Sequence, residues 1–226
     1  SQPNQNASVS VGLSQEWQRL KTVCRMPATW VIAFAGFAFW APMSVFAELW
    51  GPSFLARSEC ITLLKASEQM KWLWLGVAMG GPILGWLSHR LQSCRIPMIF
   101  GFLACLLATS WLIYGVHHDL VWVDVVLFVF GFSCAGQCLT FGLVRQLHAS
   151  TALGTAIGLN NMAVILGGVI LQPLAGWILD FYHSDVCHAS VYHFSLAAYQ
   201  HAFIMIPMVS VLGFLVTLFY IKENNN

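Results

Sequence analysis

Two acidic residues, Glu48 and Asp124, lie at the edges of long apolar stretches of the sequence. A charged side chain at the centre of a bilayer costs about 2.5–3.5 kcal/mol on insertion scales. Acids among apolar residues therefore often serve a purpose such as reversible proton binding. Both acids stand near the ends of their stretches, where this cost is lower. We expect them to be candidates for reversible protonation, with an ordinary interfacial position as the alternative.

A second group of residues follows the spacing of one helix face. Phe37, Trp40 and Ser44 stand at i, i+3 and i+7, and Glu48 continues the same face toward one end. Such a face can line a path for a solute, or it can pack against neighbouring helices. We therefore treat Phe37, Trp40 and Ser44 as substrate-path candidates, with packing as the alternative.

Four amide side chains, those of Gln137, Asn160, Asn161 and Gln172, also interrupt apolar stretches. Polar groups within membrane helices are costly and tend to face the interior of a helix bundle. The two asparagines are adjacent, so they cannot both point the same way from a helix. We expect these amides to face a solute path or to form hydrogen bonds between helices.

The composition defines the element type that must position these residues. Of 226 residues, 58% are hydrophobic and only 8% are charged, which excludes an ordinary soluble domain. The net charge of +1 offers no basic surface for nucleic acid. Six uncharged stretches of 18 to 36 residues separate the charges, and about 20 apolar residues span a bilayer as a helix. The sequence predicts an all-α membrane protein with spans over residues 28–50, 68–88, 96–115, 121–143, 152–180 and 197–221.

The segments outside the spans indicate the orientation. Residues 1–12 are polar and we expect a disordered tail, whereas residues 13–27 have the pattern of an amphipathic helix on the membrane surface. The six-span domain covers 28–221, and 222–226 form a second tail. Seven Lys and Arg residues fall on the face that carries both termini and three on the opposite face. The excess of positive charge predicts that both ends are cytoplasmic.

An internal repeat divides the six spans. The segment Pro82 to Leu87 matches Pro173 to Ile178 at an offset of 91 residues, and Gly76 matches Gly167 at the same offset. Three spans separate the copies, so matching helices cross in opposite directions. This pattern indicates two inverted three-helix repeats, over about 28–115 and 121–221. Chance matching in a restricted alphabet is the alternative.

Four segments resemble the C-terminal half of a major facilitator superfamily transporter. They resemble the central linker and the start of span seven, the outer end of span seven, the second copy of the family's loop motif, and span eleven. These segments are residues 26–30, 46–52, 85–95 and 154–174. The resemblance covers nearly the whole chain from residue 14. In the loop motif, Gly85, Arg90 and Arg95 fit the pattern, whereas His89 stands where the family has an acid and Gln92 where it has glycine.

The resemblance implies membrane transport of a small polar solute, driven by an ion gradient, as in symport. It implies that the first helix of each repeat lines the path and that Glu48 and Asp124 are coupling candidates. It also makes Gly85, His89, Arg90 and Arg95 a candidate gate, with a positively charged membrane anchor as the alternative. The expected partners are the lipid bilayer, the solute, and an N-terminal six-span half in the same longer chain or a second copy. The segments resemble bacterial members, which implies the inner membrane.

Other functions remain open. A six-span scaffold and an inactive remnant are the main alternatives. A rhomboid-like protease would use a serine such as Ser133 and a histidine such as His201, but the glycine expected after the serine is Cys134. We expect no enzyme activity, cofactor or metal. His183, His188 and His193 recur every five residues in one loop, but this spacing matches no standard zinc site.

Overall fold

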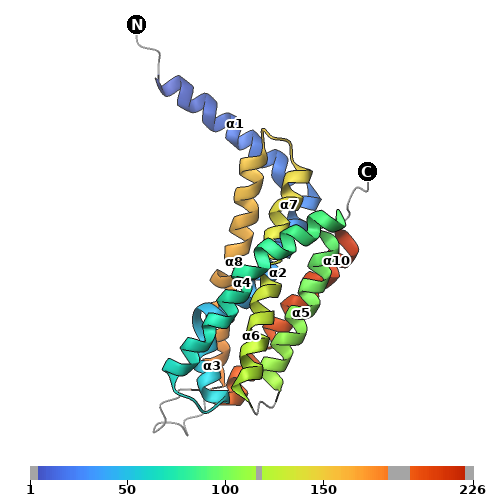
Figure 1. Ribbon diagram of the computed structural model, residues 1–226. Helices are drawn as coiled ribbons and strands as arrows, with labels where there is room; N and C mark the ends of the chain where they lie inside the picture. The colour runs from blue at the N-terminus through green and yellow to red at the C-terminus, as the bar shows by residue number, and fades with distance from the viewer. Residues whose placement is uncertain (1–4, 116–118, 183–193, 222–226) are drawn as a thin grey trace.

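The computed structural model describes residues 5–115, 119–182 and 194–221, and every regular element among them is helical (Figure 1). The elements are α1 (Gln5–Arg25), α2 (Pro27–Val45), the π-helical turn η1 (Phe46–Trp50), α3 (Gly51–Ser58), α4 (Leu63–Leu91), α5 (Arg95–Tyr114), α6 (Leu120–Cys134), α7 (Gln137–Leu147), α8 (Leu153–Phe181), α9 (Leu196–Phe203) and α10 (Met205–Tyr220). The expectation of an all-α membrane fold is confirmed.

Within the described residues, five helical runs are long and apolar enough to cross a membrane: Pro27–Ser58, Arg95–Tyr114, Leu120–Leu147, Leu153–Phe181 and Leu196–Tyr220. The sixth expected span corresponds to α4. This helix has 29 residues, or about 44 Å, and runs the length of the bundle (Figure 1). It is less apolar because Lys65, Glu68 and Lys71 stand in its first third. Six spans therefore agree with the path of the chain, whereas composition supports five.

Some expected boundaries were wrong. The first span, expected to end at residue 50, continues without a break to Ser58, because η1 joins α2 to α3. The fourth span, expected as one helix, is divided between Cys134 and Gln137, and the last is divided at Ile204. The interruption at Gly136 places its Cα close to Phe39, whose ring would lie 2.7 Å from an added Cβ. Close packing, which has no local sequence signal, explains this break.

The N-terminal tail also differs from expectation. Residues 5–12, expected to be disordered, form the first turns of α1. No proline lies between Gln5 and Arg25, so nothing in the backbone chemistry interrupts the helix once it has begun. In Figure 1, α1 extends away from the bundle, and only its C-terminal end lies against the other helices. Polarity alone therefore did not determine whether this segment is helical.

The helix contacts follow the inverted repeat. Helix α4 packs along α6, and α8 packs along α2; likewise α5 packs on α6, and α10 on α2. The repeat predicted that Gly76 and Gly167 are equivalent. An added Cβ at Gly76 would lie 2.2 Å from the Phe128 carbonyl oxygen of α6, and one at Gly167 would lie 2.7 Å from Ala41 Cβ of α2. The two matched glycines therefore occupy equivalent helix crossings, as the inverted repeat predicts.

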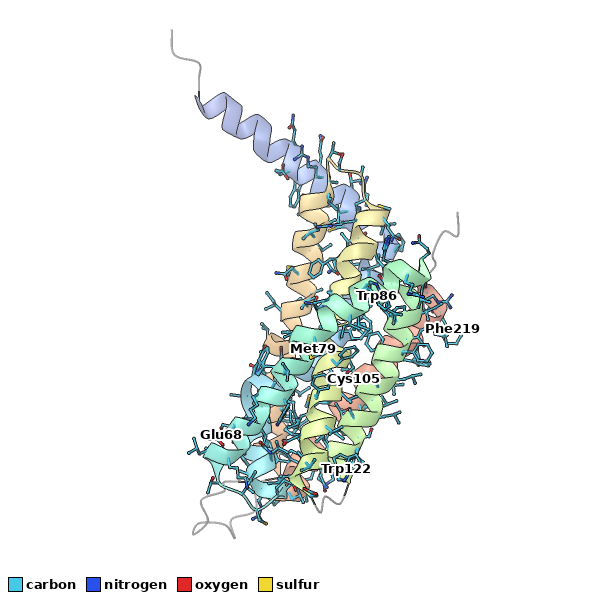
Figure 2. All side chains as sticks on the ribbon, viewed as in Figure 1. Glu68, Met79, Trp86, Cys105, Trp122 and Phe219 are labelled. Atoms are coloured by element: carbon cyan, nitrogen blue, oxygen red, sulfur yellow. The ribbon has the colours of Figure 1, made fainter. Side chains whose placement is uncertain are left out.

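Exposed aromatic side chains lie toward both ends of the bundle. Trp86 and Phe219 are near one end and Trp122 is near the other (Figure 2). Each is more than half exposed. Amphipathic rings at these positions match the interfacial belts of membrane proteins. The C-terminal ends of α1 and α10 lie at the same end of the molecule (Figure 1). This arrangement agrees with an even number of passes of the chain through the membrane.

Candidate functional site

The π-helical turn η1 positions the acid Glu48. The backbone N–H of Gly51 bonds to the carbonyl oxygen of Phe46, five residues earlier, and an added Cβ at Gly51 would lie 2.4 Å from that same oxygen. Glycine at position 51 therefore permits the wide turn. Phe46 remains buried whereas Glu48 is exposed. Single π-helical turns within membrane helices frequently mark functional positions.

One side chain from α8 joins this turn. The Gln172 amide nitrogen donates a hydrogen bond to the Ser44 carbonyl oxygen at 2.9 Å and lies 3.4 Å from Glu48 Oε2. The Trp50 indole N–H donates to the Gln172 carbonyl oxygen at 3.3 Å. Gln172 was one of the four amides that the sequence analysis expected to face a solute path or to form hydrogen bonds between helices, and it bonds α8 to α2.

The predicted face of α2 is only partly open. Phe37 and Trp40 are half-buried, and Phe37 stacks on Phe34 with ring centroids 5.8 Å apart. Ser44 is buried, and its Cβ would lie 3.2 Å from a Cβ added at Gly168 of α8. The two aromatic residues therefore remain partly accessible, as do Val31 and Phe34 of the same helix. Ser44 instead occupies a helix–helix contact.

The amide residues separate into two environments. Asn160 of α8 is buried and donates to Thr140 Oγ1 of α7 at 2.9 Å. Thr140 in turn donates to the backbone oxygen of Gln137 at 2.7 Å. Asn161 is exposed, and Gln137 is half-buried at the first residue of α7. Among the described residues, the side-chain oxygens of Asn160 and Gln137 are buried without a hydrogen-bond partner.

Asp124 of α6 faces α4. It is half-buried, and its carboxyl group interacts with Gln69, Lys71 and Trp72. One carboxylate oxygen is buried without a hydrogen-bond partner in the described part of the chain. Asp124 and Glu48 thus lie on different elements with different neighbours, and no contact among the described residues joins them.

The loop-motif residues lie at the C-terminal end of α4 and the start of α5. His89 and Arg90 are exposed, and the Arg90 guanidinium lies 5.4 Å from the centre of the Trp86 ring. A Cβ added at Gly85 would meet no atom within 4 Å. Arg95 donates a hydrogen bond to the Leu218 carbonyl oxygen near the end of α10. A cation at the C-terminal end of a helix is stabilising, so Arg95 helps to join α5 to α10.

A histidine that the sequence analysis did not select joins α7 to α2. His148 Nε2 lies 3.0 Å from Thr29 Oγ1, and both residues are buried. Burial lowers the pKa of His148 from its ordinary value, because desolvation penalises the charged imidazolium. Nothing in the local spacing of His148 predicts this contact, since its partner is 119 residues away.

The protease alternative depends on Ser133 and His201, and the metal alternative depends on a cluster of ligand side chains. Ser133 is buried and donates to the Phe130 carbonyl oxygen at 2.7 Å. His201 is exposed and stacks on Tyr182. Across residues 5–115, 119–182 and 194–221, no group of three His, Cys, Asp or Glu side chains is placed to hold a metal ion. His183, His188 and His193 lie outside these ranges.

Two comparisons with known proteins complete this description. A family model described as Major Facilitator Superfamily matches residues 75–226, about two thirds of the chain. Among curated proteins, the chain is 24% identical over 208 residues to the membrane sensor protein UhpC of Escherichia coli (strain K12). The match covers 88% of this chain and 45% of that protein, so the chain spans less than half the length of this relative.

Proposed function

The chain belongs to the major facilitator superfamily, and from that premise we propose that it is the C-terminal half of an ion-gradient-driven transporter of a small polar solute. The observation that carries the proposal is the symmetric contact pattern, in which α8 packs along α2 as α4 packs along α6. Inverted repeats of this kind support rocking of one helix unit against another around a central site. The proposed location is the bacterial inner membrane, with both ends of the chain in the cytoplasm.

The solute path in this proposal runs along α2 and α7. Phe37 and Trp40 supply partly accessible aromatic surface, and Gln137 supplies an amide at the break between α6 and α7. Asn161 of α8 is the exposed member of the asparagine pair. Little charge stands among these residues, which favours a neutral or zwitterionic solute such as a sugar or an amino acid.

The complete transporter in this proposal contains an N-terminal six-span half. The relative that matches this chain is more than twice as long as the matched part. Two exposed glycines of α8, Gly154 and Gly158, would meet no atom within 4 Å if they carried a Cβ. The surface of α8 at these two glycines therefore carries no side chains, and it lies beside the exposed side chains of Met162 and Ile165. Pairing of two copies of this chain is the alternative arrangement.

Glu48 is the proposed coupling residue. It is exposed on η1, the turn that follows α2, and its neighbour Gln172 belongs to α8. Binding of a proton would remove the charge next to this amide and change the contact between the two helices. Asp124 is the second coupling candidate, because it is a half-buried acid between α4 and α6.

Uptake by reconstituted vesicles tests this function. The full-length protein would be placed in liposomes and assayed with radiolabelled hexoses and neutral amino acids, with and without an imposed proton gradient. We expect one solute to accumulate only when the gradient is present. Uptake that is equal with and without the gradient, for every solute in the panel, would contradict the coupled transport proposal.

A sensor is the second candidate function, because the matching relative is named as a membrane sensor protein. A sensor of this fold would bind its solute without moving it. Intrinsic tryptophan fluorescence reports binding, since Trp40 and Trp50 lie near the candidate site. A saturable fluorescence change without uptake of the same solute would favour the sensor over the transporter.

A further inference from the structure

Two thiols and two hydroxyls meet within the bundle, apart from the candidate site. Cys105 of α5 and Cys134 of α6 place their sulfur atoms 4.0 Å apart. Ser210 of α10 donates a hydrogen bond to Cys105 Sγ at 3.4 Å, and Ser133 stands beside Cys134. All four side chains are buried. Cys105 is labelled near the middle of the bundle in Figure 2.

We propose that Cys105 and Cys134 form an oxidative modification site, which hydrogen peroxide converts into a disulfide bond between α5 and α6. The two sulfurs are already near van der Waals contact. A disulfide bond length of about 2.05 Å requires them to approach by about 2 Å, and side-chain rotation together with a small helix shift can supply this movement. Among the other described cysteines, Cys60 is exposed and Cys24 is half-buried.

One neighbouring hydroxyl favours Cys105 as the sulfur that reacts first. Ser210 has one hydroxyl hydrogen, which it can donate to Cys105 Sγ at 3.4 Å or to the Ile206 carbonyl oxygen at 3.1 Å. The contact between the two thiols does not decide the order, because either sulfur can be the donor. A donor directed at a sulfur stabilises its thiolate form, so we assign Cys105 as the nucleophile and Cys134 as the residue that closes the bond.

The reaction has two balanced steps. The Cys105 thiolate attacks one oxygen of hydrogen peroxide, the O–O bond breaks, and the departing hydroxide takes up the proton that Cys105 released, which leaves a sulfenic acid and one water. The Cys134 sulfur then attacks the sulfenic sulfur, the S–O bond breaks, and the hydroxyl leaves with the Cys134 proton as a second water. The two thiols lose two electrons in total, and these reduce one peroxide to two waters.

Burial makes the site selective for a small oxidant. Cys105 and Cys134 are at most 1% exposed, so a reagent the size of a maleimide cannot reach them without opening the bundle. Hydrogen peroxide is close to water in size and crosses membranes. The bond would tie α5 to the last residue of α6, immediately before the break at residues 135–136. Oxidation would thus fix the position of residues 135–136 relative to α5.

Mass spectrometry of peroxide-treated chain tests the proposal. The chain in native membranes would be oxidised, its remaining thiols alkylated, and the product digested with chymotrypsin, because no Lys or Arg separates Cys105 from Cys134. We expect a linked peptide pair that is lighter by two hydrogen atoms than its reduced components and that a reductant separates. The pair should persist in Cys60→Ser and be absent from Cys105→Ser and Cys134→Ser.

A further variant that keeps both cysteines tests the proposal even if the cysteine variants fail to fold. Ser210→Ala removes the donor to Cys105 and should slow formation of the bond several-fold without abolishing it. Maleimide should label Cys60 in the folded chain but neither Cys105 nor Cys134. A linkage that uses other cysteines, sulfinic acid at Cys105 without linkage, or maleimide labelling of Cys105 in the folded chain would each overturn the proposal.

Discussion

Gln172 of α8 donates a hydrogen bond to the Ser44 carbonyl oxygen of α2 at 2.9 Å, and the same nitrogen lies 3.4 Å from Glu48 Oε2. One amide therefore contacts both the end of α2 and the acid on the π-helical turn that follows it. The next residue, Pro173, has no N–H, which interrupts the hydrogen bonding of α8 at the same level. Two irregular helix segments thus meet at the carboxylate of Glu48.

The proposed coupling role of Glu48 predicts a specific transport defect. In the full-length protein, Glu48→Gln keeps the side-chain shape and a hydrogen-bonding partner for Gln172 but cannot bind and release a proton. We expect gradient-driven accumulation of the solute to fall to its equilibrium level, whereas exchange of labelled for unlabelled solute persists. Vesicle uptake and counterflow measure the two activities.

The matched control for this prediction is Asp180→Asn. Asp180 is an exposed acid at the end of α8, so removal of its charge should leave both activities unchanged. If Glu48→Gln retains accumulation, or if it loses exchange together with accumulation, Glu48 is not the coupling residue.

The helical fold could be predicted from the sequence because it depends on the composition of long stretches of the chain. Apolar stretches between charges identify membrane helices from a scan of one chain, and the repeat of Gly76 and Gly167 identified equivalent crossings. Gly154 and Gly158 also have a spacing that suits close helix packing, yet they face open space. Spacing shows that a close approach is possible, but only the fold shows which helix face is covered.

The candidate site was less predictable because its contacts join distant residues. Adjacent Asn160 and Asn161 look alike in the sequence, yet one is buried against Thr140 and the other is exposed. Ser44 has the spacing of the accessible Phe37 and Trp40 but is covered by α8. The π-helical turn over residues 46–50 has more residues per turn than an α-helix, so helical spacing measured from the start of α2 does not extend to Glu48.

The crossing of α4 and α6 predicts a strong effect of a small substitution. In Gly76→Ala, the new Cβ would lie 2.2 Å from the Phe128 carbonyl oxygen, and this backbone atom can move only if the helices separate. Overpacking of this kind typically costs about 1–3 kcal/mol. We expect a lower thermal unfolding temperature in detergent, measured with a dye that reacts with newly exposed cysteines.

Gly81→Ala on the same helix provides the control. A Cβ at Gly81 would meet no atom within 4 Å, so the added methyl group should leave the unfolding temperature unchanged or raise it slightly through helix propensity. Equal destabilisation by the two substitutions would show that α4 and α6 do not cross at Gly76.

The C-terminal end of α4 predicts a stabilising substitution. Gln92 has φ of 49° and ψ of 33°, the left-handed conformation that glycine adopts without cost. Its side chain compensates in part by donating to the His89 carbonyl oxygen at 2.6 Å. A non-glycine residue in this conformation costs roughly 1–2 kcal/mol. We expect Gln92→Gly to stabilise the protein by up to about 1 kcal/mol, measured by the same thermal assay.

Gln92→Ala separates the two contributions at this position. Alanine keeps the backbone strain but loses the side-chain hydrogen bond, so Gln92→Ala should be less stable than the unmodified chain. If Gln92→Gly were also less stable, the side-chain bond would outweigh the strain and the predicted gain would be wrong.

The buried contact between His148 and Thr29 predicts a pH dependence of stability. Burial lowers the pKa of His148 in the folded chain below its ordinary value of about 6.5. At pH values below 6.5 the unfolded chain therefore binds a proton that the folded chain does not, and the free energy of unfolding falls as the pH decreases. At pH values above the pKa of His148 in the unfolded chain, the contribution of this contact to the free energy of unfolding is fully retained. We expect the thermal unfolding temperature to be lower at pH 5 than at pH 7.5.

Two histidine variants test the source of this pH dependence. In His148→Gln, which can still bond to Thr29 but does not titrate, the difference in unfolding temperature between pH 5 and pH 7.5 should shrink. His89→Gln, at an exposed position of α4, should leave it unchanged. A His148→Gln variant with the full pH dependence of the unmodified chain would show that other groups cause it.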